Sequence, residues 1–121
     1  MKYILLIHTD EGAFAALSEA ERQQIFGEYM QLTQQIRSSG HWLAGAPLHP
    51  AASAKSVRIR GGKPIVTDGP FAETREQLGG YVLIEANDRD EAVGIAARTP
   101  GARLGTVEVR PVVEAAAPAP V

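Results

Sequence analysis

The chain has 121 residues, of which 45% are hydrophobic and 21% charged, the profile of a single globular domain. Its net charge of -2 offers no basic surface for nucleic acid or an anionic membrane, and its lack of cysteine excludes disulfides and cysteine metal sites. No apolar run approaches the ~20 residues that span a membrane, and the run after Lys2 is too short for a signal-peptide core. We therefore expect a cytoplasmic protein that binds neither membrane nor, directly, nucleic acid.

The hydrophobic pattern predicts four strands and two helices, with a hairpin inserted between the second and third of these strands. In chain order we expect a strand over residues 2–8, a connector over 9–17, a helix over 19–39, a strand over 41–46, a loop over 48–55, hairpin strands over 56–60 and 64–68, a strand over 79–85, a helix that starts at Asn87 or Asp88 and is stopped by Thr99-Pro100-Gly101, and a strand over 104–112. The domain is predicted to cover residues 1–114, and the Ala- and Pro-rich residues 115–121 to form a disordered tail.

Local signals mark the boundaries of these elements. Ser18 and Glu21 have the spacing of a capping box, in which each side chain accepts from the backbone amide of the other. Asp88 and Glu91 repeat this spacing before the second helix. The Gly61–Gly62 pair between two alternating runs predicts a tight hairpin turn that needs positive φ at both positions.

The order of elements predicts an α+β fold. Without the hairpin, the order is the split βαββαβ arrangement of ferredoxin-like domains, with an antiparallel sheet and two helices on one face. The two strands that this arrangement makes central, 2–8 and 79–85, are also the two that are apolar on both faces. Because the face without helices is apolar as well, we expect a homodimer in which two sheets pack face to face.

The same arrangement brings several strand ends to one rim of the sheet. His8 ends the first strand, and Gly79 begins its antiparallel neighbour. The loop after Asp68 must therefore arrive at this rim. We expect His8, Thr9, Asp68, Phe71 and Gly79–Gly80 to be neighbours, and His41 to lie at the opposite end.

His8 is the best candidate for acid–base chemistry. An unperturbed histidine exchanges its proton near neutral pH, and an aspartate on its other ring nitrogen would orient it as a general base. Asp68 is the candidate partner, and a partly buried structural histidine is the alternative. The three histidines lack the short spacings of known metal sites, so no metal and no cofactor is predicted.

The stretch from Asp68 to Phe71 has two interpretations. In the structural one, Asp68 accepts from backbone amides of its turn, Gly69 takes unusual dihedral angles, and Phe71 packs the loop onto the core. In the functional one, Asp68 is a polar anchor beside a cleft and Phe71 is an apolar wall. Gly79–Gly80 would either let a ligand approach the backbone or form a bulge at the strand start.

One long motif resembles a known family. The family is the DGPF family of the YCII-related superfamily, and the residues that carry the resemblance are Asp68-Gly69-Pro70-Phe71-Ala72-Glu73-Thr74-Arg75-Glu76-Gln77-Leu78-Gly79-Gly80-Tyr81. The opening Met1-Lys2-Tyr3 and the closing Gly105-Thr106-Val107-Glu108-Val109-Arg110-Pro111 are also similar to the ends of that family. The resemblance covers residues 1 to about 114 and implies a dimeric α+β barrel.

The resemblance implies less about chemistry. Some relatives are fused to, or encoded beside, extracytoplasmic-function sigma factors, which implies a possible sigma-factor partner. A few YCII-type relatives are lyase-like enzymes that use a histidine on the first helix with a nearby aspartate. The corresponding position here is Tyr29, so that pair does not carry over.

Three functions follow as hypotheses. The first is a homodimeric module, without turnover, that binds a small molecule or docks onto a partner such as a sigma factor. Its ligand-binding residues would be Thr9, Asp68, Gly69, Pro70, Phe71, Gly79 and Gly80. The second is a small cofactor-free lyase or isomerase that transfers protons through His8 and Asp68. The third is a purely structural dimer domain.

Overall fold

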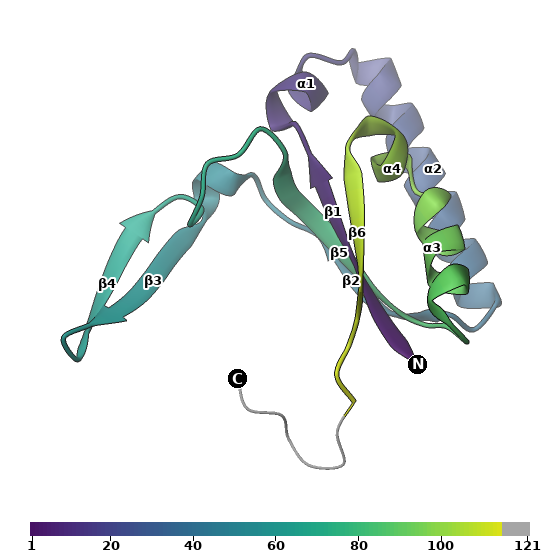
Figure 1. Cartoon of the computed structure of the whole chain (residues 1–121). Helices are drawn as coiled ribbons and strands as arrows, with labels where there is room; N and C mark the ends of the chain where they lie inside the picture. Colours follow the sequence, from purple (N-terminus) through teal and green to yellow (C-terminus); the bar gives the residue numbers. More distant parts are fainter. Residues whose placement is uncertain (115–121) are drawn as a thin grey trace.

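A four-stranded antiparallel sheet with the strand order β2-β5-β1-β6 forms the body of the molecule (Figure 1). The computed structural model describes residues 1–114. The strands are β1 (Lys2–Thr9), β2 (Trp42–Pro47), β5 (Gln77–Glu85) and β6 (Thr106–Pro111). The two strands expected to be central, β1 and β5, are the central pair, which confirms the predicted α+β arrangement. The predicted tail, residues 115–121, lies outside the described residues.

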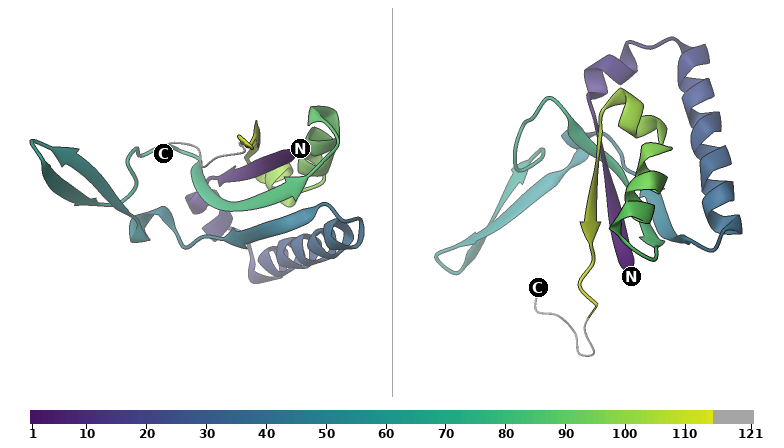
Figure 2. Two further views of the ribbon diagram at one scale, coloured as in Figure 1. Left: turned by 90° about the horizontal axis from the view of Figure 1, so that it is seen from below. Right: turned by 45° about the vertical axis from the view of Figure 1, so that its right-hand side comes forward.

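The helices lie on one side of this sheet (Figure 2). They are α2 (Glu19–Ser38), α3 (Arg89–Ala97) and the short α1 (Glu11–Ala15) and α4 (Pro100–Leu104). The capping box of α2 is formed: the Glu21 amide donates to Ser18 Oγ at 3.1 Å, and the Ser18 amide donates to Glu21 Oε1 at 3.3 Å. Asp88 likewise caps α3, accepting from the Glu91 amide at 2.9 Å.

Two short helices replace segments predicted as connectors. Asp10 Oδ1 accepts from the Ala13 amide at 3.0 Å and begins α1 inside the predicted connector 9–17. Thr99 caps α4, with Pro100 in its first turn, where the sequence predicts only the end of the preceding helix. A five-residue helix is too short to show a 3.6-residue repeat, so its cap is its only sequence signal.

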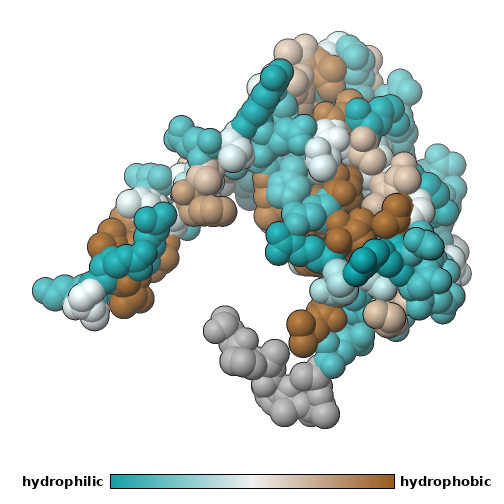
Figure 3. Space-filling view, viewed as in Figure 1, coloured by the Kyte–Doolittle hydropathy of each residue, from teal (hydrophilic) through white to brown (hydrophobic). Residues whose placement is uncertain are grey.

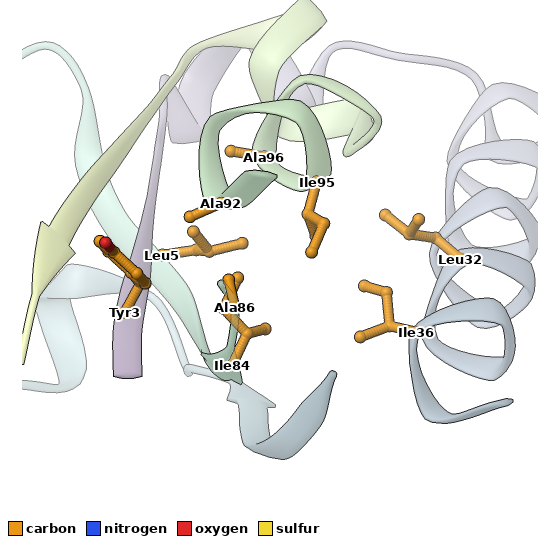
Figure 4. Close-up of a cluster of buried hydrophobic side chains, with 9 residues drawn as sticks. All are labelled: Tyr3, Leu5, Leu32, Ile36, Ile84, Ala86, Ala92, Ile95 and Ala96. Atoms are coloured by element: carbon orange, nitrogen blue, oxygen red, sulfur yellow. The ribbon is translucent and has the colours of Figure 1, made fainter. Parts of the chain in front are cut away.

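The core lies between the sheet and the two longer helices (Figure 4). It consists of Tyr3 and Leu5 from β1, Ile84 and Ala86 at β5, Leu32 and Ile36 from α2, and Ala92, Ile95 and Ala96 from α3. Leu5 and Ile84 are fully buried. Their burial identifies the face of each central strand that packs against the helices.

The other side of the sheet, which we call the open face, is not covered by any element of residues 1–114. Residues directly opposite each other in antiparallel strands share a side, so the strand register defines this face. It consists of Ile4, Leu6 and His8 of β1, Leu78, Tyr81 and Leu83 of β5, Ala44 and Ala46 of β2, and Thr106, Glu108 and Arg110 of β6. Most of these side chains are partly exposed. The centre of the open face is apolar.

The predicted hairpin projects from the body as a separate two-stranded sheet, which we call the arm (Figures 1 and 2). It consists of β3 (Lys55–Arg60) and β4 (Lys63–Asp68) and follows the short 3-10 helix η1 (Ala51–Ser53), which lies within the predicted loop 48–55. Gly61 and Gly62 have φ of 57° and 74°, as the predicted turn requires. Figure 3 shows apolar surface both on the arm and on the body beside it.

Candidate functional site

His8 contacts a carboxylate on the open face, but that carboxylate belongs to Glu108. His8 Nε2 lies 3.5 Å from Glu108 Oε1, and the two side chains are 29% and 39% exposed. The register explains the contact, since His8 pairs with Thr106 and Leu6 with Glu108. His8 and Glu108 are therefore diagonal neighbours on the same side of the sheet.

Further polar side chains surround this pair. Arg110 Nε donates to Glu108 Oε2 at 2.5 Å, and Thr106 Oγ1 donates to Glu76 Oε1 at 2.8 Å. We call His8, Glu76, Thr106, Glu108 and Arg110 the rim cluster. The hydrogen bond from Arg110, followed by the charge of Arg110 and the nearby His8, lowers the pKa of Glu108 below its usual value. Glu108 is therefore an ionised carboxylate at neutral pH.

An ionised carboxylate beside one ring nitrogen gives histidine a defined chemical role. Glu108 favours a proton on the His8 Nε2 that faces it, which leaves Nδ1 as the acceptor. His8 can then accept a proton or a hydrogen bond through Nδ1, and Arg110 supplies a cation on the other carboxylate oxygen of Glu108. The rim cluster can bind a small polar molecule or exchange a proton with it.

The structure does not bring Asp68 to His8. Asp68 ends β4, where it is paired in register with Lys55, and its carboxylate forms an ion pair with the Lys55 ammonium across the arm. The Asp68 side chain is 84% exposed. The arm thus places Asp68 outside the rim cluster, and Glu108 has the position that the sequence assigned to Asp68.

The segment after Asp68 fits the structural interpretation at Gly69 but neither interpretation at Phe71. Phe71 is 83% exposed, so it neither packs the loop onto the core nor lines a cleft within residues 1–114. Gly69 has φ of 91°, as its expected unusual dihedral angles require. Its amide donates to Ala54 O at 2.7 Å and its carbonyl accepts from Ser56 Oγ at 2.8 Å. The turn with Pro70 is therefore held by the base of the arm.

Gly79 and Gly80 lie at the expected rim but serve strand packing. The pairing of β1 with β5 shifts register at Gly79, which is the bulge that the sequence offered as one alternative. A Cβ on Gly80 would lie 3.1 Å from Ala46 O, and one on Gly79 would lie 3.4 Å from Thr9 Oγ1. Gly80 therefore lets β2 approach β5 closely, whereas the contact at Gly79 is an ordinary van der Waals distance.

The remaining histidines do not join this site. His41 lies at the opposite end of the sheet, as expected, and both its ring nitrogens are occupied, by Ser39 Oγ at 2.6 Å and Glu91 Oε1 at 2.9 Å. His49 is exposed in the loop after β2. In the part of the chain that the structure describes, no three His, Asp or Glu side chains are close enough together to hold a metal ion.

Tyr29 lies on the other side of the sheet from His8. Its hydroxyl group is close to Gly101 of α4 and to the side chain of Ile7, which points toward the helices. Burial raises the pKa of Tyr29, while a hydrogen bond from the Gly101 amide opposes that rise. Tyr29, the position that the sequence resemblance matched to a helical histidine, is therefore separated from the rim cluster by the sheet.

Sequence reasoning missed Glu76, Glu108 and Arg110. A usable signal was present, because Thr106, Glu108 and Arg110 alternate on one face of the last strand, which runs beside the first. The register of β1 against β6 could not be predicted from the sequence. This register determines that Glu108, rather than another acidic residue, contacts His8.

The outer surface of the helices offers no comparable site. A shallow depression over the outer face of α2 is lined by Gln31, Gln34, Gln35, Ser38 and Ser39, none of which is titratable. None of the helices within residues 1–114 combines the length and the apolar character needed to cross a membrane.

Comparison with known proteins places the chain in a family. Residues 1–116 match the YCII-related domain. An uncharacterised protein of Rhizobium meliloti (strain 1021) is 35% identical over 113 residues, which cover 92% of this chain and 91% of that protein. The match spans both central strands, the arm and the rim cluster. The chain therefore belongs to the family of YCII-related domain proteins.

Proposed function

We propose that this protein is a homodimeric binding module of the DGPF subfamily, in which the open face packs against the same face of a second copy. The rim cluster then holds a small polar ligand at the edge of the interface. The observation that carries this proposal is an apolar sheet face that is bordered along β6 by a polar, partly exposed cluster.

The centre of the open face supports the dimer. Ile4 is paired with Leu83 and Leu6 with Tyr81, so apolar side chains are adjacent across the central strands. A contiguous apolar surface on a soluble domain normally marks an interaction site. Because a two-fold dimer uses the same patch on both subunits, this surface can cover itself without a second kind of surface.

The position of the rim cluster supports the ligand. Its side chains belong to β1, β6 and the loop before β5, and they run from the end of β1 along the edge strand β6, beside the apolar centre. Packing a second sheet over that centre would reduce the solvent around His8 and Glu108 and strengthen their polar interactions. Small-molecule sites commonly combine such an apolar surround with a few convergent polar groups.

Leu83→Glu tests the dimer. Wild-type protein should sediment at twice the 12.9 kDa chain mass, and Leu83→Glu at the chain mass, because each copy would bury a carboxylate in an apolar interface. Val93→Glu on the outer side of α3 is the matched control and should remain dimeric. A monomeric wild type would contradict the proposal and leave the open face to a different protein, such as the sigma factor that the family resemblance suggests.

A proton-transferring lyase or isomerase is the second candidate. The contact between His8 and Glu108 favours it, because a carboxylate that orients an imidazole is the usual arrangement of a general base. The base pair would be His8 and Glu108 in place of His8 and Asp68. Arg110 would stabilise negative charge that develops on the substrate.

One experiment separates binding from turnover. NMR spectra of the histidine rings are recorded while pools of small polar metabolites are added, and the pools are then assayed for product. Binding at the rim cluster should shift the His8 signals and leave those of His41 unchanged, and Arg110→Ala should abolish the shift. Product that disappears with Glu108→Gln would establish the enzyme. If no pool moves His8, the ligand site is contradicted.

A further inference from the structure

The arm has two chemically different faces. In its register Val57 lies opposite Val66 and Ile59 opposite Pro64, and these four side chains share one face, which we call the apolar arm face. The Lys55–Asp68 ion pair lies on the same face, at the base of the arm. The opposite face, which we call the basic arm face, carries Ser56, Arg58, Arg60, Lys63, Ile65 and Thr67. A ribbon with one apolar and one charged face is amphipathic, like a strand pair at the surface of a larger sheet.

Nothing within residues 1–114 covers the apolar arm face. Val57, Ile59 and Val66 are each about 60% exposed, and the two strands of the arm make their extensive contacts only with each other. An isolated two-stranded hairpin is marginally stable in water, because it has no apolar layer to pack against. The arm would therefore be stabilised by a surface outside residues 1–114.

We propose that the apolar arm face packs on the body of a second copy of this chain, so that each copy of the dimer clasps the other with its arm. This inference rests on the proposed homodimer and adds a second contact to it. The arm projects away from its own body beside the open face, which leaves room there for the partner's body (Figures 1 and 2).

Charge complementarity favours a second copy as the occupant. The arm holds four of the 12 basic residues of the chain and one of its 14 acidic residues, so the rest of the chain has eight basic and 13 acidic residues. Within residues 1–114, Arg58, Arg60 and Lys63 form no ion pair, since only Lys55 pairs, with Asp68. With three more basic than acidic residues, the arm is attracted at long range to a body with five more acidic than basic residues, whereas two arms repel each other. The contact itself is made by the apolar arm face.

The area available for the interface also favours docking of the arm on a second copy. The open face is about 19 Å wide and about 20 Å long, from four strands ~4.8 Å apart and ~3.3 Å per residue, or roughly 400 Å². A stable dimer buries about 800 Å² per partner. One face of the arm adds about 200 Å² on the same geometry. The area buried by sheet contact alone is therefore small for a stable dimer, and docking of the arm supplies part of the missing area.

Neighbouring residues of β4 provide a matched test. Val66 is on the apolar arm face and 58% exposed, and Ile65 is on the basic arm face and 47% exposed. The chain has no cysteine, so Val66→Cys and Ile65→Cys each carry a single thiol. Reaction with a maleimide is followed under reducing conditions at protein concentrations above and below the dimer midpoint, determined by sedimentation for each variant.

Docking of the arm should slow the reaction of the Val66→Cys thiol about tenfold in the dimer relative to the monomer, as burial of one apolar side chain implies. The rate of the Ile65→Cys thiol should change less than about twofold. Equal rates for the Val66→Cys variant in dimer and monomer would overturn the docking while leaving the sheet dimer intact.

Two further outcomes of the same experiment are decisive. If neither variant nor the wild type dimerises, the proposed function itself fails, and the docking of the arm fails with it. Protection of the Val66→Cys thiol only when anionic phospholipid vesicles are added would assign the apolar arm face to a membrane and also overturn the inference.

Discussion

Tyr29 packs where α2 meets α4, against Gly101 and Ile7. A Cβ on Gly101 would lie 2.7 Å from the Tyr29 hydroxyl oxygen and 2.6 Å from Ile7 Cγ2. The phenol is therefore packed against backbone and accepts a hydrogen bond from the Gly101 amide. A side chain in this position stabilises the junction of two helices with β1.

Tyr29 should make stability depend on alkaline pH. Burial raises its pKa above the usual value near 10. A raised folded-state pKa gives stability that is complete below the unfolded pKa and is lost as pH rises through the folded one. Tyr29→Phe should lose about 1 kcal/mol at pH 7, since the Gly101 amide loses its acceptor, and should lose less stability between pH 9 and about pH 12 than wild type does.

Urea unfolding at a series of pH values measures both effects. Tyr81→Phe, which changes a phenol on the open face, is the control and should keep the alkaline loss of the wild type. An unchanged loss of stability in Tyr29→Phe would show that another group is responsible.

Helix α2 contains a glycine that packing does not require. A Cβ on Gly27 would meet no atom within 4 Å, and Gly27 lies in the interior of the helix at negative φ. Glycine costs helix interiors about 0.5–1 kcal/mol relative to alanine. Gly27→Ala should therefore raise the free energy of unfolding by about that amount, as measured by urea denaturation.

Gly105, between α4 and β6, is by contrast a glycine that packing does require. A Cβ on Gly105 would lie 2.2 Å from the carbonyl oxygen of His8. Because two backbones must separate to admit it, Gly105→Ala should lower the free energy of unfolding by about 1–3 kcal/mol or more. Equal effects of the two alanines would contradict the packing seen at these positions.

The elements that the sequence predicts well have redundant local signals. Helix α2 has a capping box and an apolar stripe, and the arm has alternation on both sides of Gly61–Gly62. The short helices α1 and α4 have only a cap each. Strand β5 begins two residues earlier than expected, because pairing continues through the bulge at Gly79 to Gln77.

For the whole molecule, which residues meet depends more on how the strands are connected and paired than on the types of side chain. The sheet order follows from the sequence, because strands that are apolar on both faces must be central. The partner of His8 does not follow from it. Asp68 is close to the rim along the chain, yet its pairing with Lys55 in the arm directs it elsewhere, and Glu108 arrives from the last strand. Such a contact depends on the register of strands that are distant in sequence.

The pairing of β1 with β5 also has a consequence for how a newly made chain folds. Tyr3 pairs with Ile84, and β6 joins the other edge of β1 later still, so the central ladder joins segments from opposite ends of the domain. Pairing of this kind forms slowly, whereas the arm is a local hairpin of the kind that forms in microseconds. During synthesis β1 and α2 therefore emerge from the ribosome well before β5 and β6 have been made. Until β5 is complete, the apolar surfaces of β1 and α2 stay exposed, which is the condition under which nascent chains aggregate unless chaperones bind them.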